Sequence, residues 1–187
     1  MMLQNVTRVP VLADLGTNKE KLLLAILGSV AIAISAQISV PFYPVPITAQ
    51  TLVVLLIAIS FGAKLATGTV MLYLAQGAMG LPVFANGGAG LPYMVGPTGG
   101  YLFGFLVAAY VVGSLAERGL GRDIWSAATG MFVGHSVIYF FGVAYLSTII
   151  GVEKAVAGGL MPFLYGDALK IVLGAILLPM AWKKIER

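Results

Sequence analysis

Long uninterrupted runs of hydrophobic residues, separated by short polar or glycine- and proline-rich segments, extend from residue 22 to the C-terminal end of the chain. Strands of a membrane barrel would alternate apolar and polar positions, so unbroken runs predict membrane-spanning helices instead. The second and third runs are shorter than the roughly 20 residues that a full crossing requires, and we expect them to form a helical hairpin. The predicted fold is an all-α integral membrane protein with a bundle of six transmembrane helices, at residues 22–40, 47–61, 65–79, 99–116, 124–146 and 160–182.

The basic residues between these runs predict how the bundle sits in the membrane. Of the eleven Lys and Arg residues, nine fall on one side, Lys154 falls on the other, and Lys170 lies within the last run. Cytoplasmic loops carry an excess of Lys and Arg, so we expect both termini in the cytoplasm of a multi-pass protein of the cell membrane. The expected organisation is a cytoplasmic N-terminal segment, residues 1–21, followed by a membrane domain, residues 22–187. The nine residues are Arg8, Lys19, Lys21, Lys64, Arg118, Arg122, Lys183, Lys184 and Arg187.

Composition agrees with this assignment and excludes several classes of function. The chain is 59% hydrophobic and 10% charged, whereas soluble domains carry about 25% charged residues. It has no cysteine, no nucleotide-binding phosphate loop and no cluster with metal-ligand spacing, so we expect no metal, cofactor or catalytic site. Scattered basic residues indicate membrane topology rather than nucleic-acid binding. The single histidine, His135, is adjacent to Ser136 rather than opposed to it, and we expect it to form a hydrogen bond across the bundle.

Two charged residues, Asp167 and Lys170, lie within the last apolar run. A charge near the centre of a bilayer costs at least about 2.5–3.5 kcal/mol, so it is retained mainly where it pairs or meets a ligand. At a spacing of three, both side chains share one face of a helix and can neutralise each other. Two interpretations remain open at this point: a self-satisfied pair that only orients the helix, and a polar binding site inside the bundle.

Two uncharged connections on the side opposite to the basic residues carry further candidate groups. Residues 41–46 contain three prolines, and residues 80–98 are rich in glycine, apolar and aromatic residues. A solvated linker would be more polar, so we expect the longer segment to fold back over the bundle and to act as a lid; the alternative is a tight re-entrant connection. A small-molecule pocket combines apolar walls with a few polar groups. With the charged pair, the candidate binding residues are Gln50, Tyr43, Phe84, Asn86 and Tyr93, although an isolated aromatic residue is commonly only a membrane anchor.

Small residues recur at a spacing of four in the first predicted helix, at Ala25, Ser29 and Ala33. Side chains of this size allow another helix to approach closely. The face could therefore contact a protein partner or pack within the bundle, and the spacing alone favours internal packing.

Three motifs in this order resemble signature stretches of the BioY family, the biotin-binding S components of energy-coupling factor (ECF) transporters. They are Pro44-Val-Pro-Ile-Thr-Ala-Gln-Thr51, Gly80-Leu-Pro-Val-Phe84 and Gly96-Pro-Thr-Gly-Gly-Tyr101. The resemblance implies six membrane helices and high-affinity capture of biotin from outside, without an ATPase in this chain. It implies as partners a transmembrane T component, which would meet the small-residue face, and two cytoplasmic ATPase subunits. It also implies that the whole bundle reorients in the membrane during transport.

Biotin can be matched to the candidate residues by its functional groups. Asp167 can accept a hydrogen bond from the ureido ring, and Asn86 can serve either side of that ring. Lys170 can donate to the ureido carbonyl or neutralise the carboxylate, and the sequence leaves both possibilities open. The rival function is a stand-alone secondary carrier for biotin or a related small carboxylate. Such a carrier would typically have paired midplane carboxylates and internal repeats, whereas the chain has one carboxylate within its spans and no convincing repeat.

Overall fold

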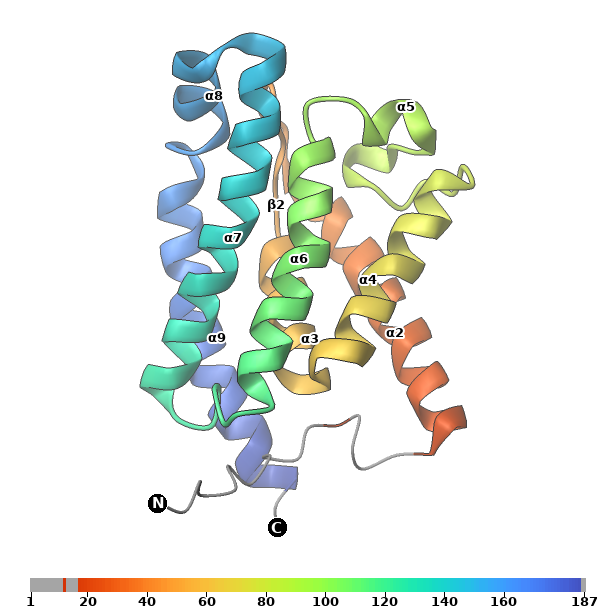
Figure 1. Cartoon of the computed structure of the whole chain (residues 1–187), viewed down its shortest axis with the longest axis vertical. Helices are drawn as coiled ribbons and strands as arrows, with labels where there is room; N and C mark the ends of the chain where they lie inside the picture. Colours follow the sequence, from red (N-terminus) through yellow and green to blue (C-terminus); the bar gives the residue numbers. More distant parts are fainter. Residues whose placement is uncertain (1–11, 13–16, 186–187) are drawn as a thin grey trace, which may run out of the picture.

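The computed structural model describes Leu12 and residues 17–185 of the chain, so most of the expected N-terminal segment, residues 1–21, lies outside the described residues. The described part is a bundle of helices with one small β-hairpin (Figure 1). Its elements in chain order are α2 Asn18–Gln37, β1 Ser39–Val40, β2 Ile47–Thr48, α3 Gln50–Phe61, α4 Ala63–Ala78, η1 Ala85–Gly87, α5 Gly90–Met94, α6 Gly99–Ala116, α7 Ile124–Ile150, α8 Val152–Gly159 and α9 Phe163–Ile185.

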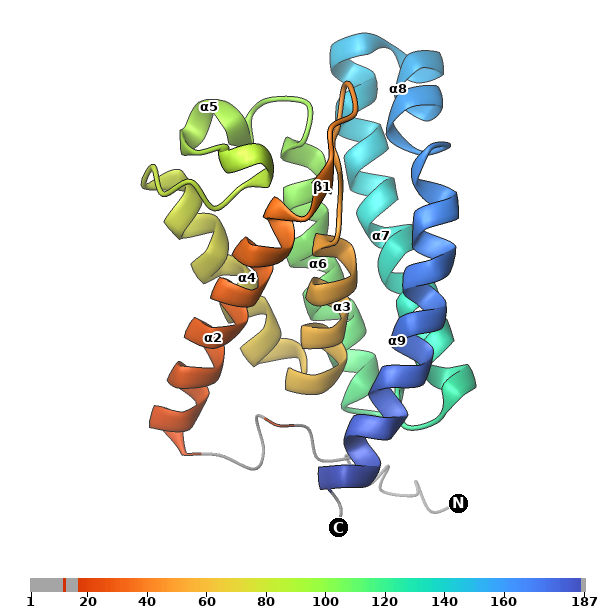
Figure 2. The ribbon, with the colours of Figure 1, turned by 180° about the vertical axis from the view of Figure 1, so that it is seen from behind.

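The helices run roughly along one axis, with α6 in the middle of the bundle (Figures 1 and 2). Helix α6 packs against α3, α4 and α7, while α9 packs against α7 and α2 packs against α4. The tip of the hairpin, α5 and α8 lie at the upper end of the bundle in Figure 1. The start of α2, the turn between α3 and α4, and the end of α9 lie at the lower end, so the described chain begins and ends on the same side.

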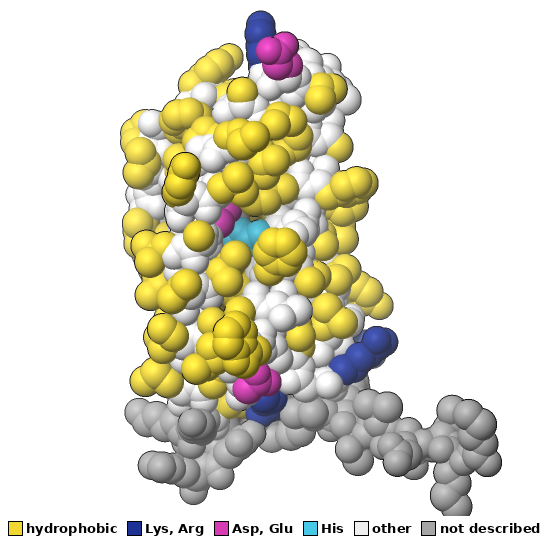
Figure 3. Space-filling model, turned by 90° about the vertical axis from the view of Figure 1, so that its left-hand side faces the viewer, with side chains coloured by type: hydrophobic (Ala, Val, Ile, Leu, Met, Phe, Trp, Pro, Cys, Tyr) yellow, Lys and Arg dark blue, Asp and Glu magenta, His cyan; other side chains and the backbone are white. Residues whose placement is uncertain are grey.

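Four helices among the described residues are long and apolar enough to cross a membrane: Asn18–Gln37, Gly99–Ala116, Ile124–Ile150 and Phe163–Trp182. Helices α3 and α4 have 12 and 16 residues and turn at Gly62, where the sequence predicted a hairpin of short helices. The structure therefore supports an all-helical membrane bundle, whereas helix length alone accounts for four of the six predicted spans. A side view shows a largely apolar face with charged side chains near its two ends (Figure 3).

The β-hairpin corrects the predicted boundaries of the first two helices. Helix α2 ends at Gln37 rather than at residue 40, and α3 begins at Gln50 rather than at residue 47. The residues between them pair in antiparallel register, with Ser39 opposite Thr48 and Val40 opposite Ile47. Backbone groups inside a membrane protein must find partners within the protein, and this pairing provides them where the prolines prevent a helix. The chain can thus turn back into the bundle halfway along its axis (Figure 2).

Helix α6 owes its central place to glycines on two of its faces. A Cβ atom on Gly104 would lie 3.0 Å from the Ile138 Cα atom of α7, and one on Gly113 would lie 2.6 Å from the backbone nitrogen of Ala63. Without side chains at these points the helix backbones can approach closely, which is how apolar helices gain packing energy in a membrane.

The segment that joins α4 to α6, residues 80–98, folds back over the bundle as the sequence predicted; we call it the outer segment. Its Phe84 side chain is completely buried. Gln37, the last residue of α2, holds this segment through both atoms of its amide. The Nε2 atom donates to the Phe84 carbonyl at 3.0 Å, and the Oε1 atom accepts from the Gly87 amide at 3.1 Å.

The predicted small-residue face of α2 is turned partly into the bundle. Ser29 is completely buried, and its hydroxyl accepts a hydrogen bond from Gln76 of α4 at 3.3 Å. Ala25 and Ala33, one helical turn before and after Ser29, are half-buried. Internal packing, which the spacing alone favoured, is therefore what the structure shows for Ser29.

Candidate functional site

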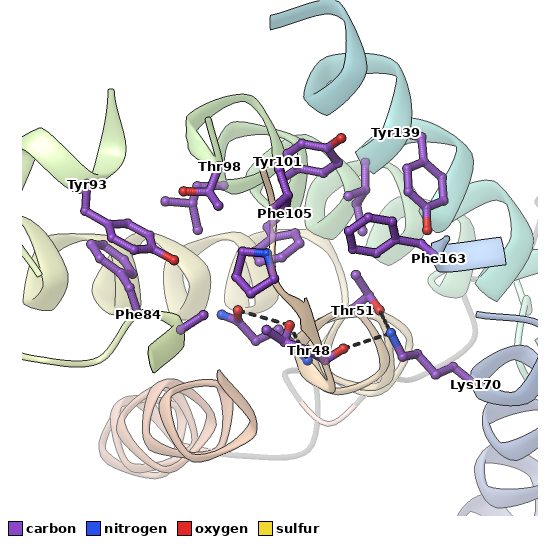
Figure 4. Close-up of a pocket in the computed structure, with 16 residues that line it drawn as sticks. Thr48, Thr51, Phe84, Tyr93, Thr98, Tyr101, Phe105, Tyr139, Phe163 and Lys170 are labelled. Carbon is purple, nitrogen blue, oxygen red and sulfur yellow. Dashed lines mark hydrogen bonds between the residues drawn. The ribbon is translucent and has the colours of Figure 1, made fainter. Parts of the chain in front are cut away.

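A cavity lies between the hairpin, the outer segment and the upper halves of α3, α6, α7 and α9 (Figure 4). Small-molecule sites combine apolar walls with a few polar groups. Six aromatic side chains line this cavity: Phe84, Tyr93, Tyr101, Phe105, Tyr139 and Phe163. The polar lining consists of Thr48, Gln50, Thr51, Thr98 and Lys170.

The aromatic side chains are arranged in contacting pairs that fix the shape of the cavity. Phe84 and Tyr93 of the outer segment stack with their ring centroids 5.0 Å apart. On the other side, the Phe163 ring lies 6.5 Å from that of Tyr101 and 6.3 Å from that of Tyr139. Burial raises the pKa of the Tyr93 hydroxyl, which therefore stays neutral and able to donate a hydrogen bond.

Lys170 of α9 supplies the positive charge of the cavity. Its ammonium group donates to the carbonyl oxygen of Thr48 at 2.8 Å, to the Thr51 hydroxyl at 2.9 Å and to Asp167 Oδ1 at 2.8 Å. Thr48 precedes α3, so the hairpin that breaks the expected helix also exposes the carbonyl that binds this lysine. The ammonium thus links α9 to the start of α3 at the wall of the cavity (Figure 4).

Asp167 lies one side chain behind the cavity wall, and its side chain is only 5% exposed. Besides Lys170, it accepts a hydrogen bond from the Tyr139 hydroxyl at Oδ2. The Nε2 atom of His135 lies 3.4 Å from Oδ1. His135 and Tyr139 both come from α7, where a spacing of four residues places them on one face of the helix. The charged pair predicted from the sequence is therefore the centre of a larger network that joins α3, α7 and α9.

Gln50 is buried at the start of α3, where its amide joins Thr48 of the cavity wall to Tyr73 of α4. Its Nε2 atom donates to the Tyr73 hydroxyl at 2.7 Å, and its Oε1 atom accepts from the Thr48 hydroxyl at 3.2 Å. Tyr73 in turn donates to the carbonyl of Val83 at 3.3 Å. Since these groups already bond to one another, Gln50 holds the outer segment against α3 as well as lining the cavity.

The structure brings four of the predicted residues to the cavity: Lys170, Gln50, Tyr93 and Phe84. Asp167 contacts it only through Tyr139 and Lys170. Asn86 and Tyr43 lie outside the lining. Asn86 is exposed, with a positive φ of 56°, and accepts a hydrogen bond from Ser39; Tyr43 is 85% exposed at the tip of the hairpin.

Several lining residues were not among the sequence candidates. Thr48, Thr51, Thr98 and Tyr101 lie within the motifs that carried the family resemblance, which was a usable signal. Tyr139 and Phe163 had no such signal, because an aromatic residue in an apolar run can equally face lipid or a cavity. In the described part of the chain, no group of His, Asp or Glu residues could hold a metal ion.

Comparisons with known proteins place the chain in one family. The model of the BioY family matches residues 7–187. A biotin transporter from Thermotoga maritima is 44% identical over 156 residues, covering 83% of this chain and 90% of that one. A second biotin transporter, from Rhizobium etli, is 38% identical and covers 79% and 83% of the two chains. A crystal structure of the S-component for biotin from an ECF-type ABC transporter superposes with a TM-score of 0.79 at 24% identity, covering 90% of this chain and 95% of that one.

Proposed function

The chain belongs to the BioY family, and we propose that it is the biotin-binding membrane subunit, or S component, of an ECF-type importer. The observation that carries the proposal is the cavity, which combines an aromatic wall with one ammonium group. Biotin has a neutral, rigid double ring, an alkyl chain and a carboxylate. The aromatic wall suits the rings and the chain, and the carboxylate is best placed nearest to Lys170, because opposite charges attract most strongly where water is excluded.

We propose that the lower end of the bundle faces the cytoplasm. That end carries Lys64 at the start of α4 and Arg118 and Arg122 between α6 and α7, whereas Lys154 lies on α8 at the other end. An excess of Lys and Arg is typical of cytoplasmic loops. In this orientation, within the cell membrane, the cavity lies in the outer half of the bundle and the outer segment covers it from outside. Biotin would then enter from the exterior.

The partner subunits remain part of the proposal. The sequence lacks a nucleotide-binding phosphate loop, so energy for import would come from separate ATPase subunits and a transmembrane T component. Of the predicted contact residues of α2, Ser29 is buried, whereas Ala25 and Ala33 are partly exposed. Ala33 also packs against the core, so Ala25→Trp is the sharper test of the partner surface. This variant should no longer co-purify with the partner subunits, and its biotin binding should be unchanged.

Equilibrium binding of labelled biotin to the purified full chain in lipid nanodiscs tests the central proposal. We expect saturable binding that unlabelled biotin displaces. Phe163→Ala should weaken binding, because Phe163 lines the cavity and is 8% exposed. Phe140→Ala is the matched control, since that ring is 69% exposed on the outside of α7. Absence of biotin binding by the folded wild-type protein would refute the proposal. An equal loss of biotin affinity in both variants would show that biotin does not bind in this cavity.

A further inference from the structure

We infer that the Thr51 hydroxyl, and not the Lys170 ammonium, donates the hydrogen bond that the cavity offers to the carboxylate of its ligand. Lys170 supplies the positive charge, and Thr51 selects for an oxygen acceptor at this place. Both side chains line the cavity, and a dashed line joins them in Figure 4. The inference assigns a residue within the proposed function and rests on that function for the identity of the ligand.

The first step counts the hydrogens of Lys170. An ammonium group has three hydrogens to donate and no lone pair. The structure gives it three acceptors: the Thr48 carbonyl at 2.8 Å, the Thr51 hydroxyl at 2.9 Å and Asp167 Oδ1 at 2.8 Å. All of its hydrogens are therefore engaged. The charge can attract a carboxylate, but the ammonium can donate to that carboxylate only by breaking one of these bonds.

The second step is the direction of the Thr51 hydroxyl. Because an ammonium group only donates, the Thr51 oxygen accepts, and its own hydrogen points away from Lys170. Among the residues that the structure describes, this hydrogen has no acceptor. Since Thr51 lines the cavity, the hydroxyl is a donor available to a ligand. A hydroxyl that accepts from a charged group is polarised and becomes a stronger donor itself.

The third step compares Thr51 with the other hydroxyl groups around the charged pair. The Thr48 hydroxyl is engaged by Gln50 on both sides: it accepts from the backbone N–H at 3.2 Å and donates to Oε1 at 3.2 Å. The Tyr139 hydroxyl donates to Asp167. Thr51 is thus the group here that can donate without breaking an existing bond. It also lies in the first turn of α3, where the helix dipole favours negative charge.

The test replaces Thr51 by valine or by serine and measures equilibrium binding of biotin to the full chain in lipid nanodiscs. Valine has the branched shape of threonine, with a methyl group in place of the hydroxyl. That methyl group also blocks the hydrogen that Lys170 loses a partner for. We expect Thr51→Val to weaken biotin binding about tenfold or more, as for a lost hydrogen bond to a charged group. Thr51→Ser keeps the hydroxyl and should bind within about threefold of the wild type.

Thr69→Val is the matched control, because Thr69 is completely buried in α4 and its hydroxyl donates only to the Leu65 carbonyl of its own helix, at 2.8 Å. Its biotin affinity should stay within about twofold of the wild type. A second ligand, in which a methyl group replaces the carboxylate of biotin, separates a donor from a structural residue. We expect Thr51→Val to leave the affinity for this analogue nearly unchanged.

Two results would overturn the inference. If Thr51→Val bound biotin as tightly as the wild type, Lys170 would itself release a bond and donate to the carboxylate. If Thr51→Val weakened biotin and the analogue equally, Thr51 would only shape the cavity. The ratio of the two affinities does not depend on how much of the protein is folded, so a partly unfolded variant still gives an answer. Failure of the folded wild-type protein to bind biotin would refute the proposed function, and the inference with it.

Discussion

Replacing Lys170 by Met tests whether the charged pair of α9 serves the ligand or only the fold. Methionine has a similar length but no charge, so the change removes the three hydrogen bonds to Thr48, Thr51 and Asp167 with little loss of volume. Removing one partner of a buried ion pair costs about 3–5 kcal/mol, since the other charge is left uncompensated. The lower end of that range applies here, because Tyr139 still donates to the Asp167 carboxylate. We therefore expect Lys170→Met to lower the free energy of unfolding by about 3 kcal/mol.

The same substitution should weaken biotin binding tenfold or more, which corresponds to about 1.4 kcal/mol. The double variant Lys170→Met with Asp167→Asn separates the two effects. It no longer contains the uncompensated carboxylate, so much of the lost stability should return. Biotin affinity should stay low, because the ammonium group at the cavity wall is still missing.

The assays are thermal unfolding of the ligand-free protein and equilibrium binding of biotin, each performed on the wild type, both single variants and the double variant. Asp167→Asn alone should also weaken binding tenfold or more, through its effect on Lys170 and Tyr139. If the double variant bound biotin as tightly as the wild type, the pair would have only a structural role. The placement of the biotin carboxylate at Lys170 would then be wrong.

Three further predictions follow from the cavity and its cover. Gly77→Ala should weaken biotin binding, because the new Cβ atom would collide with the Phe84 ring. In the same helix, the Cβ atom of Gly68→Ala meets nothing within 4 Å, so this variant should bind biotin normally and stabilise the fold by about 0.5–1 kcal/mol. Binding and unfolding measurements on both variants check this, and equal biotin affinities of the two variants would contradict it. Gln37→Ala should speed both biotin release and hydrogen exchange of the backbone amides in the outer segment, because it removes the two hydrogen bonds from the Gln37 side chain to that segment. An unchanged release rate would show that the segment does not control the exit of biotin. Tyr43→Ala should leave biotin affinity within about twofold, because this exposed side chain lies outside the cavity; a large loss would extend the site to the tip of the hairpin.

The sequence alone determined the features that depend on local composition. Continuous apolar runs predict helices because a bilayer leaves the backbone no other partners, and the boundaries of α6 were predicted to the residue. Asp167 and Lys170 stood out because charges are rare in such runs. The sequence also predicted that the outer segment folds back, since an uncharged, aromatic segment is unsuited to solvent.

The interior arrangement was decided by the tertiary structure. In a water-soluble protein, polarity distinguishes the buried face of a helix from the exposed one; in a membrane, both faces are apolar. The sequence therefore could not tell that Phe163 lines the cavity while Phe140 lies outside, or that Ser29 packs against Gln76. The hairpin at Val40 and Ile47 depends on pairing between residues apart in the chain, which no local pattern records. The neighbourhood of His135 likewise exists only because α7 and α9 pack side by side, which brings its imidazole to Asp167.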